Sequence, residues 1–345
     1  ARSGRAVPAP RQRRRPNRPH GAAFVVRPRP SAAVRIRIFR NPRSGSAEAA
    51  AGLLEAVAAR DDLTLVEVAS PAEMERAVRE AAEAGVDVVA AAGGDGTVHA
   101  VANALMAVGG AADELPALAV LPLGTGNDLA RTLAVPLDAS EALALVGYGR
   151  RRPLELIRVC PTEGDACYAI NVAAGGFTAD MRERLDHGLK KRWGPLAYVI
   201  AGLQTIPGAT VYNVRLRRDG GMVDRMALHS LVVASGRTAG GGQPAAPMAN
   251  PEDGRLDVVT VREAPAGALV ALAARAALGD YLQSELVDTW RVRRLEVEAS
   301  PPMRFTVDGE VKAVTPATFE AVPRALRVVV GDDYDPEPDY APPPE

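Results

Sequence analysis

The sequence predicts an α/β plus β fold, with an N-terminal Rossmann-like α/β domain followed by a C-terminal β-sandwich domain. Strand-like and helix-like stretches alternate as far as residue 150, which is typical of a parallel sheet covered by helices on both faces. Short β-type runs dominate after that point and favour a mostly antiparallel sandwich. With 345 residues, the chain is long enough for two domains that each have a core.

The first half contains four apolar runs that we expect to be strands. They span residues 34–39, 63–68, 86–92 and part of 115–123. Each is followed by a stretch rich in alanine and leucine or with helical spacing, and Pro71 stands at the first turn of one of them. The expected helices span residues 47–60, 71–85, 98–108, 128–135 and 139–146.

The second half contains eight expected β-type runs and two helices. The runs span residues 154–160, 167–174, 210–218, 225–235, 255–262, 293–299, 303–309 and 325–331, and the helices about 179–206 and 265–283. We assign residues 33–150, with about 315–331 returning, to the α/β domain. The sandwich domain is expected to span residues 151–314.

Both chain ends differ from the middle in charge and composition. Residues 1–30 contain nine arginines and no acid, and residues 331–345 contain six acids and no base. We interpret residues 1–32 as a disordered basic tail and residues 332–345 as a disordered acidic tail. Arginine tracts can bind acidic lipid or nucleic acid, but a solvated tail is favoured here and no nucleic-acid partner is expected.

Several other classes of protein are disfavoured by composition. No run of eighteen apolar residues is present, and the N-terminal residues lack the apolar centre of a signal peptide, so any membrane contact should be peripheral. Cys160 and Cys167 are the only cysteines, which favours reduced thiols in the cytoplasm over a disulfide framework. Oligomeric state cannot be inferred from the sequence.

Three glycine-containing loops follow expected strands: NPRSG (41–45), GGDGT (93–97) and GTGND (124–128). In an open α/β sheet, ligands bind beyond the carboxyl ends of the strands. Glycine lets main-chain N–H groups approach a ligand closely, and a helix N-terminus favours negative charge. No GxxxxGK[ST] motif occurs, so we expect these loops to hold a polyphosphate without a lysine.

Two aspartates in these loops need a separate explanation, because a carboxylate repels phosphate. Asp95 and Asp128 therefore suggest Mg²⁺, or hydrogen bonds to hydroxyl groups of ribose or substrate. Each could instead cap the helix that follows it, and this alternative is stronger for Asp128.

The second half supplies two further acidic clusters. Asp253 lies in a Pro/Gly loop that enters an expected strand, with Asp257 beyond it. Asp308 and Glu310 flank Gly309. An Asp-Gly pair is also a common β-hairpin signal, so residues alone favour a hairpin over a proton acceptor at this position.

Taken in order, the motifs NPRSG, GGDGT, LPLGTGNDLAR, a GGG loop leading to EDGRLDV, and VDGE resemble the diacylglycerol kinase catalytic-domain family. This family includes bacterial soluble diacylglycerol kinases, related phospholipid kinases and sphingosine kinases. The resemblance covers about Val34 to Gly331. It implies an ATP-binding α/β domain and a β-rich lipid domain, with ATP and the lipid acceptor meeting in a cleft.

The resemblance also implies roles for individual residues. Nucleotide contacts are expected from Asn41, Pro42, Arg43, Ser44, Gly45, Ser70, Gly93, Gly94, Gly96, Thr97, Thr125, Gly126, Asn127 and Asp128. A magnesium site would use Asp253 and the main-chain carbonyls of Asn250 and Arg255. Glu310 is the expected proton acceptor, with Asp308 as its neighbouring candidate and Asp95 near the reacting phosphate.

The predicted function is an ATP- and Mg²⁺-dependent lipid kinase that phosphorylates a hydroxyl of diacylglycerol or a similar lipid. His99, Ala100, Thr178 and Ser235 depart from the family pattern and leave open a catalytically weak nucleotide-binding regulatory relative. A soluble-metabolite kinase similar to NAD kinases is a third possibility. Lys190, Lys191 and Arg192 precede Trp193, which suits contact with the inner membrane face, but a solvated turn before a packed helix is slightly favoured.

Overall fold

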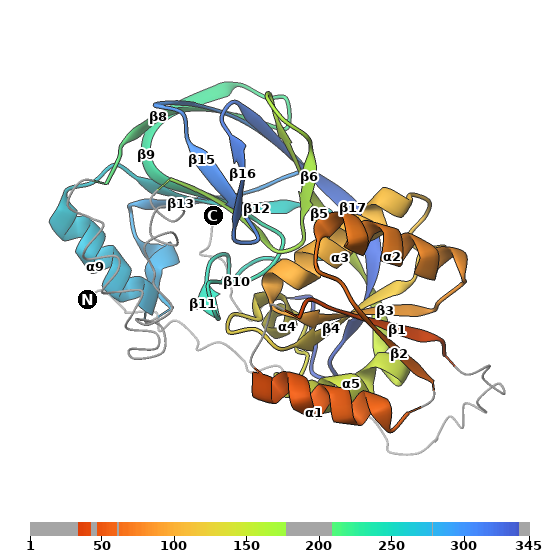
Figure 1. The fold of residues 1–345 in the computed structure, drawn as a ribbon. Helices are drawn as coiled ribbons and strands as arrows, with labels where there is room; N and C mark the ends of the chain where they lie inside the picture. Colours follow the sequence, from red (N-terminus) through yellow and green to blue (C-terminus); the bar gives the residue numbers. More distant parts are fainter. Residues whose placement is uncertain (1–33, 43–46, 61, 177–208, 278, 338–345) are drawn as a thin grey trace, which may run out of the picture. The chain divides into compact units, whose positions relative to one another are not determined.

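The described chain consists of an α/β part followed by a β-rich part (Figure 1). The computed structural model describes residues 34–42, 47–60, 62–176, 209–277 and 279–337, and the statements below concern these residues. Arg43, Ser44, Gly45 and the helix expected at 179–206 lie outside them. The predicted α/β plus β fold class is confirmed.

Four parallel strands form the sheet of the α/β part, in the order β2-β1-β3-β4. Every residue of β3 and β4 is buried, as expected for strands covered on both faces. Helices α2 and α3 pack together on one face, and α1 and α5 pack together on the other (Figure 1). The strand bounds are Ile36–Arg40 for β1, Leu63–Glu67 for β2, Val88–Gly93 for β3 and Ala117–Pro122 for β4.

The helices of this part begin close to the carboxyl ends of the strands. Ser70 caps α2: its hydroxyl accepts from the N–H of Glu73, and the Glu73 carboxylate accepts from the N–H of Ala69. The Ser70 hydroxyl therefore satisfies one N–H of the first turn, and Pro71 stands at the first helical position as predicted. The helices span Ala47–Ala58 (α1), Pro71–Glu83 (α2), Asp95–Val108 (α3), Asp128–Thr132 (α4) and Ala139–Tyr148 (α5).

The β-rich part is built from mostly antiparallel strands whose residues alternate between core and solvent, as along β8. Its long strands are β5 (Arg150–Pro161), β8 (Tyr212–Arg218), β9 (Val223–Ala234), β12 (Leu256–Arg262), β13 (Val287–Val292), β14 (Arg294–Ser300) and β17 (Ala317–Val330). The shorter strands are β6 (Cys167–Ala169), β7 (Val172–Gly176), β10 (Thr238–Ala239), β11 (Gln243–Pro244), β15 (Arg304–Val307) and β16 (Glu310–Val314). Helix α9 (Ala266–Ala277) and a short 3₁₀ helix (Tyr281–Gln283) complete it.

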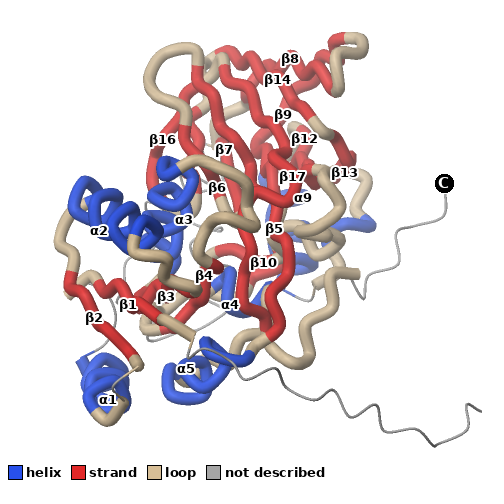
Figure 2. Tube along the Cα trace, turned by 90° about the vertical axis from the view of Figure 1, so that its right-hand side faces the viewer, coloured by secondary structure: helices blue, strands red, loops and turns tan. Residues whose placement is uncertain are grey.

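Strand β17 joins the two parts into one sheet. Its first residues pair antiparallel with β14, and most of its length pairs antiparallel with β5. Near its end, Val328 pairs with Leu118 of β4 in the parallel sense. Figure 2 shows β17 and β5 running together from the β-rich strands towards β4.

Each part has its own apolar core. In the α/β part Phe39, Leu105 and Leu118 are fully buried between sheet and helices. In the β-rich part the rings of Phe305 and Phe319 pack at a centroid distance of 4.8 Å. Each part of the described chain therefore has an apolar core of its own.

The segment expected to be a disordered acidic tail begins with residues that make defined contacts. The Arg150 guanidinium donates to the main-chain carbonyls of Gly331, Asp332 and Tyr334. Tyr334 is buried, and its hydroxyl donates to Glu252. The expectation therefore does not hold for residues 332–337, because a buried aromatic ring and an arginine clamp fix them; residues 338–345 lie outside the described residues.

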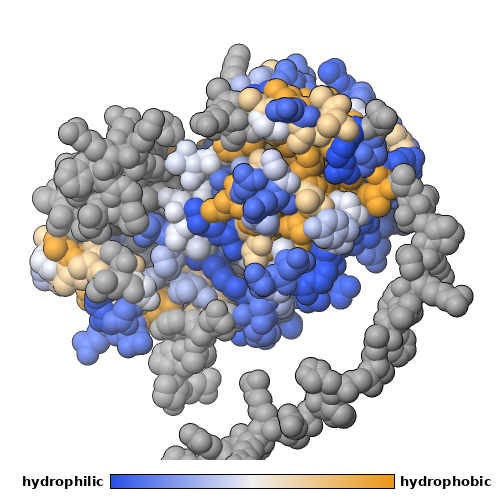
Figure 3. Space-filling model, turned by 90° about the horizontal axis from the view of Figure 1, so that it is seen from below, coloured by the Kyte–Doolittle hydropathy of each residue, from blue (hydrophilic) through white to orange (hydrophobic). Residues whose placement is uncertain are grey.

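No helix of the described ranges is long and apolar enough to cross a bilayer. Hydrophobic patches separated by hydrophilic residues cover the face in Figure 3, which is seen from below the view of Figure 1. Among the described residues, exposed large apolar side chains include those of Leu54 in α1 and Tyr148 in α5.

Candidate active site

Two of the glycine loops predicted from the sequence meet each other, main chain against main chain. The Leu123 N–H donates to the Gly93 carbonyl at 3.0 Å. A Cβ atom placed on Gly124 would lie 2.4 Å from the Cα of Gly94, a distance that no real side chain tolerates. The loops after β3 and β4 therefore form one surface, and glycine is required where they touch.

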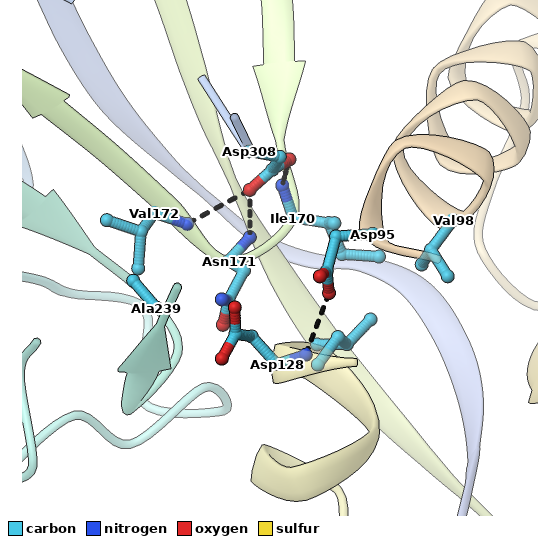
Figure 4. A pocket seen from close by; sticks show the side chains of 9 residues that line it. Asp95, Val98, Asp128, Ile170, Asn171, Val172, Ala239 and Asp308 are labelled. Atoms are coloured by element: carbon cyan, nitrogen blue, oxygen red, sulfur yellow. Dashed lines mark hydrogen bonds between the residues drawn. The ribbon is translucent and has the colours of Figure 1, made fainter. Parts of the chain in front are cut away.

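Asp95 is the first residue of α3, and its carboxylate points towards Asp128 (Figure 4). Its Oδ1 accepts from the N–H of Asp128 at 2.8 Å. A Cβ on Gly126 would lie 2.4 Å from Asp95 Oδ2, so the absence of a side chain at Gly126 makes room for this carboxylate. The aspartate of GGDGT and the glycines of GTGND are thus parts of one arrangement.

Asn127 and Asp128 hold the neighbouring loops by their side chains. The Asn127 amide accepts from the Gly124 N–H and donates to the Gly124 carbonyl, with Asn127 itself at a φ of 52°. The Asp128 side chain accepts from the N–H groups of Gly241 and Gly242. Asn127 occupies the cap position of α4 and makes no side-chain cap bond, so the alternative role of Asp128 as a helix cap is wrong.

Asp308 is held from several directions. It lies at a φ of 46° in the turn between β15 and β16, and its side chain is 2% exposed. The carboxylate accepts three main-chain N–H groups, from Ile170, Asn171 and Val172, at 2.8–3.1 Å. Both oxygens of the Asp308 carboxylate are therefore occupied by main-chain donors.

Glu310 is the accessible acid of the same turn. Its side chain is 60% exposed, and its Oε2 lies 2.8 Å from the Lys312 ammonium. The hydrogen bond from Lys312 holds the pKa of Glu310 below its usual range. Asp308 and Glu310 therefore differ in environment although they are two residues apart: one is an anchor, and the other faces solvent.

One contact of this site was not anticipated from the sequence. His99 Nδ1 lies 2.9 Å from Asp308 Oδ2, and the imidazole is 11% exposed. In the sequence His99 was noted only as a departure from the family pattern. Its position four residues after Asp95 places both side chains on one face of α3, and this spacing was the available signal.

Asp95, Asp128 and Asp308 line one pocket, shown in Figure 4. Val98, Leu129, Ile170 and Ala239 supply apolar walls. The three aspartates come from α3, α4 and the β15–β16 turn, so chain segments more than 200 residues apart by residue number converge there. The sequence predicted all three as functional candidates, and the structure brings them together.

The remaining predicted nucleotide contacts lie along the same edge of the sheet. Asn41 follows β1 and Ser70 follows β2, and both are half-buried. Pro42, Gly96 and Thr125 are exposed, and Thr97 is buried within α3. The carboxyl ends of four neighbouring parallel strands thus carry predicted residues.

The predicted magnesium residues lie in the loop before β12. Asp253 accepts from the Arg255 N–H at 2.8 Å and pairs with the Arg291 guanidinium. Within the described ranges no three His, Cys, Asp or Glu side chains are arranged as a ready metal site. The prediction therefore depends on one carboxylate and main-chain carbonyls.

Two buried acids border this loop and were not predicted as site residues. Glu155 is fully buried and accepts from the Gly254 N–H at 2.6 Å, while its other oxygen has no hydrogen-bond partner. Neither carboxylate oxygen of buried Asp257 has a hydrogen-bond partner. Burial raises the pKa of Glu155 to about 8 and that of Asp257 to about 7. Orphaned carboxylate oxygens beside Asp253 fit a bound cation.

Comparison with known proteins agrees with this picture. A model described as the diacylglycerol kinase catalytic domain matches residues 35–159, and one described as the YegS C-terminal NAD kinase beta sandwich-like domain matches residues 171–330. A probable lipid kinase YegS-like protein of Stenotrophomonas maltophilia is 36% identical over 267 residues, covering 74% of this chain and 82% of that protein. A diacylglycerol kinase of Bacillus subtilis is 30% identical over 255 residues, covering 74% and 81%.

A solved structure of a Bacillus anthracis diacylglycerol kinase shares the fold, with a TM-score of 0.66 at 20% identity over 88% of this chain and 100% of that one. The two matched domains define a kinase with an α/β catalytic domain and a β-sandwich-like second domain. The chain belongs to the diacylglycerol kinase catalytic-domain family, and its relatives include proteins named as lipid kinases. The resemblance stated from the sequence is confirmed.

Proposed function

We propose that this kinase transfers the γ-phosphate of ATP to the hydroxyl of diacylglycerol or a similar lipid, giving phosphatidic acid or its analogue. The observation that carries the proposal is the pocket lined by Asp95, Asp128 and Asp308, directly beside two glycine loops at the carboxyl ends of β3 and β4. Open α/β sheets bind their ligands at such an edge.

The triphosphate would be bound by main-chain groups of these loops. Helix α3 is 14 residues long and begins at Asp95, so its N-terminal N–H groups favour an anion. Exposed Gly96 and Thr125 stand beside that terminus, and Asn41 and Ser70 lie along the same edge. With no lysine in the glycine loops, the main chain takes the role that a Walker lysine has elsewhere.

Glu310 is the preferred proton acceptor. The lipid hydroxyl oxygen would attack the γ-phosphorus in line, the bond to the ADP oxygen would break, and the hydroxyl proton would pass to Glu310. Glu310 is exposed, and the hydrogen bond from Lys312 further favours its ionised form, which can accept a proton. Asp308 already accepts several hydrogen bonds, so its role is to hold the turn.

Mg²⁺ is the implied metal, and the loop before β12 would hold one ion. Asp253 and the carbonyls of Asn250 and Arg255 are the proposed ligands, with Glu155 and Asp257 as buried carboxylates close by. When bound, such an ion would supply positive charge that offsets these acids and supports the site.

The lipid acceptor implies contact with a membrane surface, which we place at the inner face of the cytoplasmic membrane. The basic cluster Lys190, Lys191 and Arg192 with Trp193 lies outside the described residues. A triple alanine variant of the three basic residues tests it by co-sedimentation with anionic liposomes; unchanged binding would exclude the cluster.

Transfer of radiolabelled phosphate from ATP to lipid in mixed micelles tests the proposed function. Diacylglycerol, sphingosine and phosphatidylglycerol serve as acceptors, and the product is identified by mass. Activity on none of the three contradicts the proposal. Tight ATP binding without turnover would support the regulatory alternative, and transfer to NAD in water without detergent would support the soluble-metabolite alternative.

A further inference from the structure

Two side chains of helix α3, one turn apart, contact other segments of the site. Asp95 and His99 stand at positions i and i+4 and therefore share a face of the helix. The Asp95 carboxylate meets the N–H of Asp128, and the His99 imidazole meets the Asp308 carboxylate. The same face of α3 therefore contacts both the start of α4 and the turn between β15 and β16.

The contact between His99 and Asp308 has a defined direction. Asp308 is an acceptor in each of its other side-chain hydrogen bonds, to the N–H groups of residues 170–172. The Asn103 amide nitrogen, which can only donate, lies 3.4 Å from His99 Nε2, so we assign the ring hydrogen to Nδ1 at the 2.9 Å contact. Both side chains are almost excluded from water, which strengthens the bond.

Asn103, one turn further along α3, fastens the same helix to β6. Its amide donates to the carbonyls of His99 and Tyr168, and its oxygen accepts from the Tyr168 N–H, each at 2.9 Å. The Asn103 amide also lies 3.4 Å from His99 Nε2, but its two bonds to the Tyr168 main chain hold α3 against β6 without the imidazole. Removal of the imidazole alone should leave the helix in place and loosen the link between the turn and α3, while the bonds from residues 170–172 to Asp308 remain.

We propose that His99 is a positioning residue that fastens the turn 308–310 to helix α3 and so holds Glu310 at a fixed place relative to Asp95. The inference rests on the proposed function, in which Glu310 accepts the proton. Glu310 lies two residues after Asp308, at the first position of β16. The imidazole itself contacts Asp308 and is not assigned a contact with substrate.

Two substitutions of His99 separate the effect of its hydrogen bond to Asp308 from the effect of its side-chain packing. His99→Leu removes the donor, whereas His99→Asn keeps an N–H donor in a smaller side chain. His229→Leu is the matched control, because His229 is another buried histidine and its ring nitrogens approach only the carbonyls of Thr210 and Ala264 among the described residues.

His99→Leu should lower kcat for lipid phosphorylation about 10- to 100-fold with little change in the KM for ATP, since misplacement of a catalytic group by about 1 Å has effects of this size. His99→Asn should recover most of that loss, and His229→Leu should retain kcat. A His99→Leu enzyme with the kcat of the wild type, or a His99→Asn enzyme no better than His99→Leu, overturns the proposal.

Hydrogen exchange without substrates gives a readout that does not depend on turnover. Main-chain N–H groups of residues 306–310 should exchange faster in His99→Leu than in wild type and His99→Asn, while those of α3 stay protected. Unchanged exchange in this turn also overturns the proposal. If wild-type protein phosphorylates no lipid, the proposed function fails, and the exchange comparison still decides whether His99 anchors the turn.

Discussion

The carboxylate of Asp95 accepts a hydrogen bond of 2.8 Å from the main-chain N–H of Asp128, 33 residues further along the chain. This bond joins the first residue of one helix to the first residue of another, across the two glycine loops. The arrangement places strict size limits on the loop after β4, and these limits lead to the first prediction.

Gly126→Ala should abolish phosphate transfer, because its Cβ would lie 2.4 Å from Asp95 Oδ2 and displace either the carboxylate or the loop. The comparison is Gly52→Ala within α1, where a Cβ would meet nothing within 4 Å. That substitution should leave activity unchanged and keep or raise the melting temperature. Full activity in Gly126→Ala would show that the packing of Asp95 against this loop is dispensable.

Asp128→Asn should loosen the loop of residues 240–242, since the amide replaces a charged acceptor of two N–H groups with one neutral acceptor. We expect a loss of about 1.5–3 kcal/mol in the free energy of unfolding, measured by urea denaturation. Asp138→Asn is the control, because Asp138 caps α5 and asparagine is an equally good cap. Equal stability of the two variants would contradict the assignment.

Glu310→Gln should lower kcat by about 10²- to 10⁴-fold without weakening ATP binding, as expected for loss of a proton acceptor. Lys312→Met keeps the carboxylate of Glu310 and changes only its pKa. Without the ammonium, the pKa of Glu310 rises towards its ordinary value, so the acidic limb of the pH–rate profile should move to higher pH. A profile that does not move in Lys312→Met would exclude Glu310 as the titrating base.

The buried acids near the Asp253 loop predict a pH dependence of stability. The pKa of Glu155 is raised from 4.5 to about 8, so the folded protein retains a proton that the unfolded chain releases. The free energy of unfolding should therefore fall as pH rises from about 4.5 to about 8. Glu155→Gln should flatten this slope in denaturation experiments at several pH values; an equal slope in both proteins would contradict the assignment.

Mg²⁺ bound beside Asp253 should offset the loss of stability that follows deprotonation of Glu155 at alkaline pH. Thermal unfolding at alkaline pH should shift upwards on addition of Mg²⁺ in wild-type protein. Asp253→Asn should show a smaller shift. Equal shifts in the two proteins would place any bound ion elsewhere.

The parallel part of the fold could be predicted from the sequence because strand-like and helix-like runs alternate there, and three of the four strands are followed by a glycine-containing loop. Long-range contacts could not. His99 and Asp308 are 209 residues apart, and no local pattern relates them. Residues 315–331 were assigned to the α/β domain, but the pairing of Val328 with Leu118 was not predicted, since an apolar run indicates burial and not which strand lies beside it.

The roles of single acids were harder to predict than their presence. Asp308 and Glu310 stand in one turn, yet one accepts main-chain N–H groups and the other faces solvent, and only the tertiary structure separates them. Glu155 lies within a strand-like run, and a single charged residue in such a run gives no indication that its side chain is completely buried. The start of α2 was more tractable, because proline is favoured in the first turn of a helix and Pro71 follows the strand-like run 63–68.

The place of β17 has a consequence for biosynthesis. Val328 is made 210 residues after its partner Leu118, so the edge of β4 stays open while the ribosome synthesises everything between them. A truncated product that ends near residue 160 would present that bare edge to other nascent chains. We therefore expect the first half to need the late strand, supplied in cis or as a co-expressed fragment, before it becomes resistant to protease and to aggregation.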